Sequence, residues 1–354
     1  MTGLFFVLGL GLLIGGAEML VRGSSRIAAA AGISPLVVGL TVVAFGTSAP
    51  ELAVTAAASF RGDPDLALGN VVGSNVLNVL LILGASALVA PLLVQKRLVR
   101  LEVPFMIGMT ALVVALSLNG VISRLEGAFL FIGGLVYTAV LVVRARAVAP
   151  PLADRTATFT TGAVAVNTAL VLAGLGFLVL GSQWIVNGAQ SMAAALGVPE
   201  LVIGLTVVAA GTSLPELATS VVASIQGHRD LAVGNIIGSN IFNLLIVLGA
   251  ASAISPIGVE VPLSALTFDL PVMLAVSLVC LPIFITGLKI DRLEGFIFLG
   301  FYVIYTTYLV LDAADHHALY ALQDGILFVA LPLTLLTLAA AAIRSERPEE
   351  TDRG

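Results

Sequence analysis

The sequence predicts an all-α polytopic membrane protein made of two inverted-topology repeats of five helices each, ten core spanning helices in all, plus one extra C-terminal helix. Two observations predict this class. Of the 354 residues, 59% are hydrophobic and only 10% are charged, whereas a soluble domain carries about 25% charged residues. In addition, a stretch that begins at Gly39 recurs in the second half of the chain, beginning at Gly204.

Apolar runs of about 20 residues are long enough to cross a bilayer as a helix. The chain contains eleven such runs, and we expect each of them to span the membrane. They cover residues 3–24, 34–60, 65–90, 102–119, 124–144, 160–183, 199–225, 231–254, 265–286, 292–311 and 320–343. No basic segment precedes the first run, so we expect it to be a spanning helix and not a cleaved signal.

One long polar connector, from Arg144 to Thr161, separates the fifth run from the sixth. It divides the chain into halves of similar length, and the eleventh run has no counterpart in the repeat. We therefore expect an N-terminal repeat over residues 1–145, a cytoplasmic linker over 146–160, a C-terminal repeat over 161–312, and an extra helix with a cytoplasmic tail over 313–354.

The basic residues predict the orientation, because Lys and Arg concentrate in cytoplasmic loops. The connections after even-numbered helices hold only Arg61 and Arg124. Those after odd-numbered helices hold eleven basic residues: Arg22, Arg26, Lys96, Arg97, Arg100, Arg144, Arg146, Arg155, Arg229, Lys289 and Arg292. We expect a multi-pass protein of the cell (inner) membrane with its N-terminus outside and its C-terminus in the cytoplasm.

The two copies of the repeated stretch, 39–51 and 204–216, are identical at eleven of thirteen positions. The first lies in the second predicted helix and the other in the seventh. Five helices separate them, so the copies cross the membrane in opposite directions. This inverted topology is typical of secondary transporters.

Each copy contains a helix-breaking polar motif, Gly46-Thr-Ser-Ala-Pro-Glu51 and Gly211-Thr-Ser-Leu-Pro-Glu216. Pro50 has no backbone N–H, and its ring would clash with the Gly46 carbonyl in a continuous helix. We expect a break that frees carbonyl groups, which in a membrane must meet protein, water or an ion. Glu51 and Glu216 would begin the next half-helix, and a carboxylate inside a membrane is expensive enough to indicate function.

A second motif follows on the next helix, Gly69-Asn-Val-Val-Gly-Ser-Asn-Val-Leu-Asn78, with its copy at 234–243. Residues four apart share one helical face, so Ser74 and Asn78 can point together toward Glu51. Ser239 and Asn243 are their counterparts toward Glu216. We expect Gly69 and Gly73 to let this helix approach the second helix of the same half. The remaining amides, Asn70, Asn75, Asn235 and Asn240, are expected to be mainly packing groups.

The two motif pairs supply carboxylate, amide, hydroxyl and carbonyl oxygens, which are the ligands that Ca²⁺ prefers and which also suit Na⁺. Neither motif contains His or Cys, which argues against Zn or Cu. Two carboxylates balance the charge of one Ca²⁺ or of two Na⁺. The residues therefore predict a site for hard cations inside the membrane.

The duplicated Gly-Thr-Ser-x-Pro-Glu and Gly-Ser-Asn-x-x-Asn pairs resemble the alpha repeats of the Na⁺/Ca²⁺ exchanger family, prokaryotic type, in the cation/Ca²⁺ antiporter superfamily. The resemblance covers the first ten helices. It implies Glu51 and Glu216 as central Ca²⁺ ligands that Na⁺ shares. It also implies a flanking set for Na⁺ and the site lining: the hydroxyls of Thr47, Ser48, Thr212, Ser213, Ser74 and Ser239, the carbonyls of Ala44 and Ala209, and the amides of Asn78 and Asn243.

One position departs from some relatives. Certain archaeal and K⁺-dependent members carry Asp where this chain has Asn243, and an amide does not titrate. Cation/proton members tend to carry Gly-Asn-Ala-x-Glu in the first motif, whereas Thr and Ser stand here. We therefore expect Na⁺ as the coupling ion, so that Na⁺ entry would expel Ca²⁺ by alternating access.

Ca²⁺/H⁺ exchange, or exchange of another divalent cation, stays open as an alternative, and a gated cation channel is less favoured. No nucleophile–base pair or metal-hydrolase spacing indicates an enzyme. We expect no cofactor, no nucleic-acid partner and no obligate protein partner, with Ca²⁺, Na⁺ and the lipid bilayer as the partners. Asp269, just before Pro271, is expected to cap a helix N-terminus, and Glu126 and Glu294 are expected to be structural.

Overall fold

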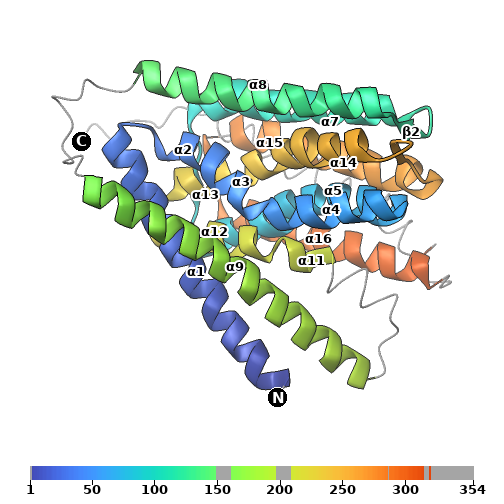
Figure 1. Ribbon diagram of the computed structural model, residues 1–354, viewed down its shortest axis with the longest axis horizontal. Helices are drawn as coiled ribbons and strands as arrows, with labels where there is room; N and C mark the ends of the chain where they lie inside the picture. Colours follow the sequence, from blue (N-terminus) through green and yellow to red (C-terminus); the bar gives the residue numbers. More distant parts are fainter. Residues whose placement is uncertain (1, 149–160, 197–208, 286, 315–318, 320–354) are drawn as a thin grey trace, which may run out of the picture.

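The computed structural model describes residues 2–148, 161–196, 209–285, 287–314 and 319. Within this part of the chain, eight helices are long and apolar enough to cross a membrane, and a ninth span is a helix pair bent by 45°. The chain is thus an all-α polytopic membrane protein, as predicted (Figure 1). The eleventh predicted helix and the tail, 320–354, lie outside the described residues.

The first half forms five spans, three of which contain π-helical segments, labelled η. Its elements are α1 (Thr2–Ala31), α2 (Pro35–Val38), η1 (Gly39–Val43), α3 (Ala44–Thr47), α4 (Ala49–Arg61), α5 (Pro64–Leu77), η2 (Asn78–Leu83), α6 (Gly84–Val89), η3 (Leu98–Glu102), α7 (Val103–Ser117) and α8 (Arg124–Val148). The first helix runs beyond its predicted end at residue 24. Arg22 and Arg26 therefore lie in a helix and not in a loop, because nothing after Met19 breaks the helix before Gly32, whose φ is +65°.

The second half repeats this order. Its described elements are α9 (Thr161–Ala195), α11 (Ala209–Thr212), α12 (Leu214–Ile225), α13 (Arg229–Phe242), η6 (Asn243–Val247), α14 (Leu248–Ile254), η7 (Ala265–Asp269), α15 (Leu270–Ile285) and α16 (Arg292–Ala313). The expected N-terminal cap at Asp269 is wrong, because η7 continues directly into α15 through this residue. Asp269 instead accepts a hydrogen bond from the Tyr305 hydroxyl at 3.0 Å. Glu294 completes a capping box with Asp291 at the start of α16, as a structural residue does.

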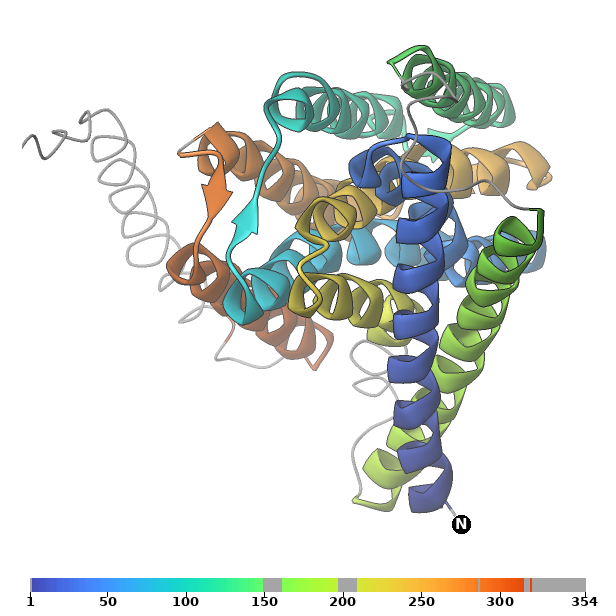
Figure 2. The same ribbon diagram turned by 90° about the vertical axis from the view of Figure 1, so that its left-hand side faces the viewer.

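Two short antiparallel ribbons join the halves. Strand β1 (Leu92–Leu93) pairs with β4 (Lys289–Ile290), and β2 (Val121–Ile122) pairs with β3 (Val259–Glu260). The first ribbon appears in Figure 2 as neighbouring cyan and orange arrows. In each half, one strand precedes the fourth span and the other follows it. The strand that precedes the fourth span of one half pairs with the strand that follows the fourth span of the other half. Since α7 and α15 separate the two ribbons, equivalent connections lie at opposite ends of the bundle, as an inverted repeat requires.

Helices α1 and α9 lie against each other and cross the other spans at an angle (Figures 1 and 2). Glycines set the closeness of this contact. A Cβ at Gly16 would lie 2.8 Å from the Gly174 carbonyl oxygen, and a Cβ at Gly9 would lie 2.9 Å from the Gly181 carbonyl oxygen. The shift in residue number that relates Gly39 to its repeat partner also relates Gly9 to Gly174 and Gly16 to Gly181. The internal symmetry therefore extends to this helix pair.

The third span of each half lies deepest in the bundle. The 18-residue apolar window of Arg229–Ile254 is completely buried, compared with 22% for Arg124–Ala145 and 17% for Arg292–Asp312. The fourth spans contact each other at the middle of α7 and α15, where the hydroxyls of Thr110 and Ser277 are 3.4 Å apart. The third spans are therefore the elements around which a central site is built, and the fifth spans form the periphery.

The glycine face of the third span packs across the halves. A Cβ at Gly234 would lie 2.6 Å from the Leu36 carbonyl oxygen, and one at Gly238 would lie 2.8 Å from Ala44 Cβ. A Cβ at Gly69 or Gly73 would meet no described atom within 4 Å. The prediction that Gly69 and Gly73 let this helix approach the second helix of the same half is wrong, because no atom of that helix lies within 4 Å of a Cβ at either position. Their equivalents in the second copy instead contact the second span of the first half, which inserts beside α13.

Gly16→Ala is expected to destabilise the protein by about 1–3 kcal/mol, since the new methyl group meets the backbone of Gly174. The neighbouring Gly15→Ala is the matched control, because a Cβ there meets no atom within 4 Å and Ala favours a helix over Gly. Thermal unfolding in detergent compares the two variants. Equal stabilities would show that the α1–α9 contact does not need the glycine.

Candidate ion-binding site

The second and seventh spans are broken at equivalent serines. Helix α3 ends at Thr47 and α4 begins at Ala49; Ser48, between them, has φ −80° and ψ 6°. Ser213 stands between α11 and α12 with nearly the same backbone, φ −91° and ψ 6°. The proline after each break occupies the first turn of the new helix, where its missing N–H costs nothing. The predicted break is therefore present in both copies.

Each break places a carboxylate in the first turn of the following helix. Glu51 lies in the first turn of α4 and Glu216 in that of α12, and both side chains are 0% exposed. The N-terminus of a helix carries a partial positive charge that favours an anion. The local fold thus holds two carboxylates in the interior of the bundle.

The serines at the breaks link these carboxylates crosswise between the halves. The Ser48 hydroxyl donates to Glu216 Oε1 at 3.1 Å, and the Ser213 hydroxyl donates to Glu51 Oε1 at 2.9 Å. The other carboxylate oxygen of each residue is buried and has no hydrogen-bond partner among the described residues. Both carboxylates therefore lie at the interface of the halves, and each keeps one oxygen for another ligand.

Two asparagines of the third spans, Asn70 and Asn235, form hydrogen bonds to the broken helices of both halves. Asn70 Nδ2 donates to the Thr55 hydroxyl at 2.8 Å and to the Glu51 carbonyl at 3.2 Å, and its Oδ1 accepts from the Thr212 hydroxyl at 3.2 Å. Asn235 repeats this pattern with the hydroxyls of Ser220, at 3.0 Å, and Thr47, at 3.2 Å. These amides are structural bridges, as expected.

The hydroxyls of Thr55 and Ser220 are parts of the site that the sequence reasoning missed. Each lies four residues after a glutamate of the first motif, so the two occupy equivalent positions of the repeat. A hydroxyl at both equivalent positions, one helical turn from the carboxylate, was the available signal. Both side chains are completely buried.

The second motif supplies a further buried polar set. Ser74, Asn78, Ser239 and Asn243 are each at most 1% exposed. The hydroxyls of both serines, Asn78 Oδ1, and both polar side-chain atoms of Asn243 have no hydrogen-bond partner in the described part of the chain. Asn78 and Asn243 are also the first residues of η2 and η6, and π-helical turns often occur at functional sites.

The remaining predicted residues lie in the turn before each break. The Thr47 hydroxyl oxygen also lies 3.1 Å from the Val43 carbonyl oxygen, an alternative acceptor for its single proton, and the Ala44 carbonyl accepts from the Ser48 N–H at 3.0 Å. Thr212 and Ala209 are the two ends of the equivalent helix α11. A carbonyl oxygen has two lone pairs, so these groups keep capacity for an ion.

The fold and this buried oxygen cluster define the class of protein, a multi-pass secondary transporter. A family model described as sodium/calcium exchanger protein matches residues 2–143 and 166–311. The chain therefore belongs to the sodium/calcium exchanger family and is an antiporter of that family.

Known proteins similar to the chain span most of its length. A putative antiporter, CaxA, of Alkalimonas amylolytica is 42% identical over 85% of this chain and 96% of its own. The sodium/calcium exchanger MaX1 of Methanosarcina acetivorans is 33% identical over the same shares. The solved structure of the sodium-calcium exchanger NCX_Mj matches with a TM-score of 0.75 at 32% identity, over 86% of this chain and 96% of that one.

Thr55→Val is expected to lower the free energy of unfolding by about 1–3 kcal/mol, because it keeps the volume but removes the acceptor of Asn70 Nδ2 in a buried place. Thr55→Ser is the matched control, since it keeps the hydroxyl and reproduces the residue found at position 220. Thermal unfolding of the purified protein measures both. A Val variant as stable as the Ser variant would contradict the bridging role of Asn70.

Proposed function

We propose that the protein exchanges Na⁺ for Ca²⁺ across the membrane, with Glu51 and Glu216 as the central ligands of one site between the halves. Na⁺ moving down its gradient would expel Ca²⁺ from the cytoplasm, without covalent catalysis. The proposed ligand set also includes flanking groups from each half: Ala44, Thr47, Ser48, Ser74 and Asn78, with Ala209, Thr212, Ser213, Ser239 and Asn243.

The observation that carries this proposal is the crosswise pairing of Ser48 with Glu216 and of Ser213 with Glu51. It brings two carboxylates from distant parts of the sequence to one buried place, where one oxygen of each has no partner among the described residues. Burying a carboxylate without a compensating charge is costly. A cation that binds both free oxygens would supply that compensation.

The chemistry of the donors supports Ca²⁺ and Na⁺ as the substrates. The proposed ligands are oxygens, which suit hard cations. Two carboxylates neutralise one Ca²⁺ or two Na⁺, and a third Na⁺ would leave a net positive charge on the site. Since the same oxygens would bind either ion, occupation by one excludes the other, which makes the exchange obligatory.

The relatives support the same substrates and a bacterial or archaeal cell membrane. The Methanosarcina acetivorans relative is called a sodium/calcium exchanger, and NCX_Mj was studied with Na⁺ and Ca²⁺. A relative from Escherichia coli, 38% identical over 77% of this chain, is an inner membrane protein. We place this chain in the cell (inner) membrane with the basic β1–β4 end, near Lys96, Arg97 and Lys289, in the cytoplasm. In this orientation the N-terminus is outside and the C-terminus is cytoplasmic.

Glu51→Gln or Glu216→Gln is expected to lower Ca²⁺ transport by about a hundredfold or more. Each variant removes one of the two negative charges but keeps the shape of the side chain, and a charge-assisted contact in a buried site is worth about 3 kcal/mol or more. Uptake of radioactive Ca²⁺ into proteoliposomes measures the loss. Near-normal exchange in either variant would show that the two carboxylates are not the central ligands of the site.

The coupling ion is tested in the same proteoliposomes by changing one gradient at a time. Vesicles loaded with Na⁺ and diluted into Na⁺-free buffer should take up Ca²⁺, while a pH gradient or a K⁺ gradient alone should not drive uptake. Uptake driven only by the pH gradient would replace the proposal by Ca²⁺/H⁺ exchange. Ca²⁺ conductance without any counter-ion would indicate a channel.

A further inference from the structure

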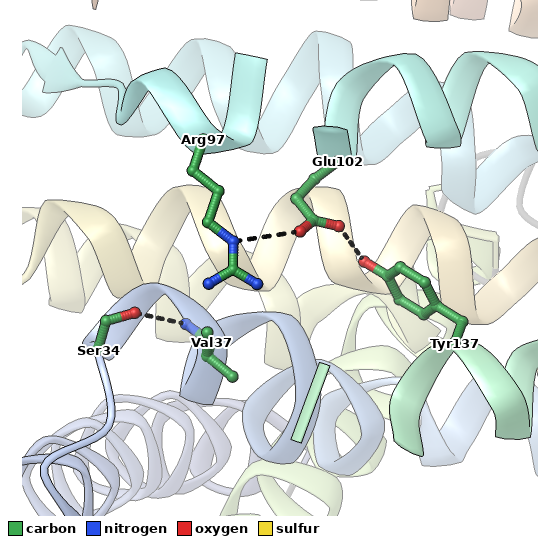
Figure 3. A network of polar contacts seen from close by, with 5 residues as sticks. All are labelled: Ser34, Val37, Arg97, Glu102 and Tyr137. Atoms are coloured by element: carbon green, nitrogen blue, oxygen red, sulfur yellow. Dashed lines mark hydrogen bonds and ion pairs between the residues drawn. The ribbon is translucent and has the colours of Figure 1, made fainter. Parts of the chain in front are cut away.

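A buried carboxylate outside the proposed site is held by a tyrosine of another span. Glu102, the last residue of η3, is 3% exposed, and its Oε2 accepts a hydrogen bond from the Tyr137 hydroxyl of α8 at 2.7 Å. Its Oε1 lies 3.8 Å from Arg97 Nε. Figure 3 shows Glu102 between these two residues. The Tyr137 ring also stacks on Phe105, with the centroids 4.6 Å apart.

The second half contains the same carboxylate–tyrosine pair. Asp269 is the last residue of η7 and accepts from the Tyr305 hydroxyl of α16 at 3.0 Å. Asp269, like Glu102, stands two positions before a proline, and Tyr305, like Tyr137, stands thirteen positions after the arginine that begins its helix. Each pair therefore links the fourth span to the fifth within its own half. Because carboxylates inside a membrane protein are costly, the retention of both pairs indicates a role for this link.

The fifth span of the first half packs on the π-helical segment of the second half. Gly134 lies one turn before Tyr137, and a Cβ there would be 2.6 Å from Ile246 Cδ1 and 3.0 Å from Leu245 Cβ. Both contacted residues belong to η6, which begins at Asn243. The second half has a tyrosine, at position 302, in the place on α16 that corresponds to Gly134 on α8. The glycine therefore gives α8 a close contact with η6 that a bulky side chain would prevent.

Asn243 depends on its backbone for its position. Neither Oδ1 nor Nδ2 has a hydrogen-bond partner among the described residues, although the side chain is 0% exposed. No side-chain hydrogen bond within that part of the protein holds the amide in place. Its place is set by the path of η6, and α8 lies directly against η6 at Leu245 and Ile246.

We propose that Glu102 and Tyr137 are positioning residues for Asn243: their hydrogen bond holds α8 against η6 and thereby places the Asn243 amide in the ion site of the other half. This inference rests on the proposed role of Asn243 in ion binding. Residues of the first half would thus determine the position of Asn243, a ligand that belongs to the second half. Loss of the hydrogen bond would let α8 and η6 shift together, which weakens ion binding without removing a ligand.

A double-mutant cycle between Tyr137→Phe and Asn243→Ala tests the proposal, with Na⁺-driven uptake of radioactive Ca²⁺ into proteoliposomes as the measurement. Tyr137→Phe should raise the half-saturating Ca²⁺ concentration about fivefold, the effect of one hydrogen bond, and should change the maximal rate less than twofold. In the Asn243→Ala background, the same change should have no further effect on half-saturation, since the amide that it misplaces is absent.

Two further variants separate positioning from a general loss of structure. Glu102→Gln keeps an oxygen that can accept from Tyr137, so its half-saturating concentration should stay within about twofold of wild type. Tyr305→Phe removes the equivalent hydrogen bond of the second half, and its effect should multiply with that of Asn243→Ala, because Tyr305 lies on α16 and not on α8. Thermal unfolding shows that each variant is folded at the assay temperature.

Multiplicative effects of Tyr137→Phe and Asn243→Ala would overturn the inference, as would a Tyr137→Phe variant that loses maximal rate and keeps its half-saturation. The proposed function fails in a different way. If Asn243→Ala alone leaves half-saturation unchanged, Asn243 is not in the site and the positioning inference falls with it. If Na⁺ drives no uptake by the wild-type protein, the exchange activity itself is wrong.

Discussion

The two reciprocal serine–glutamate hydrogen bonds are the contacts that organise this protein. Each one joins the break in one half to the carboxylate of the other, so neither half can build the central cluster alone. The broken second and seventh spans, the asparagine bridges behind them and the burial of the third spans all serve to bring these four side chains together. Each serine hydroxyl fixes the orientation of one of the two buried carboxylates.

The sequence was sufficient to predict the class, the repeat and the helix breaks, because each rests on a local or periodic signal. Apolar length predicts spans, and Pro50 and Pro215 predict breaks within one turn. The partners could not be predicted. Gly69 was expected to contact the second span of its own half, but no atom of that span lies within 4 Å of a Cβ at this position, whereas its repeat partner Gly234 contacts Leu36 of the other half. Ser48 likewise faces Glu216 although the two are far apart in sequence. Such contacts depend on how the halves interlock, which no local pattern contains.

The same limit explains the error at Asp269 and the absence of Glu102 from the predicted features. A carboxylate shortly before a proline has the appearance of a helix cap, and the appearance is misleading when a π-helical segment carries the helix through that position. The tyrosines that bind these carboxylates lie on the following span, beyond the reach of any local pattern. The π-helical segments themselves have no simple composition that distinguishes η2 or η6 from an ordinary buried helix.

The interlocked site has a consequence for how such a chain can change during evolution. After duplication, two copies of a gene segment normally diverge freely, since each can lose what the other retains. Here a substitution at Ser48 affects Glu216, and one at Ser213 affects Glu51. Each copy therefore limits the substitutions that the other can accept. The eleven identical positions of the duplicated stretch are therefore expected to drift last, whereas positions whose contacts differ between the halves, such as Gly134 and Tyr302, follow separate constraints.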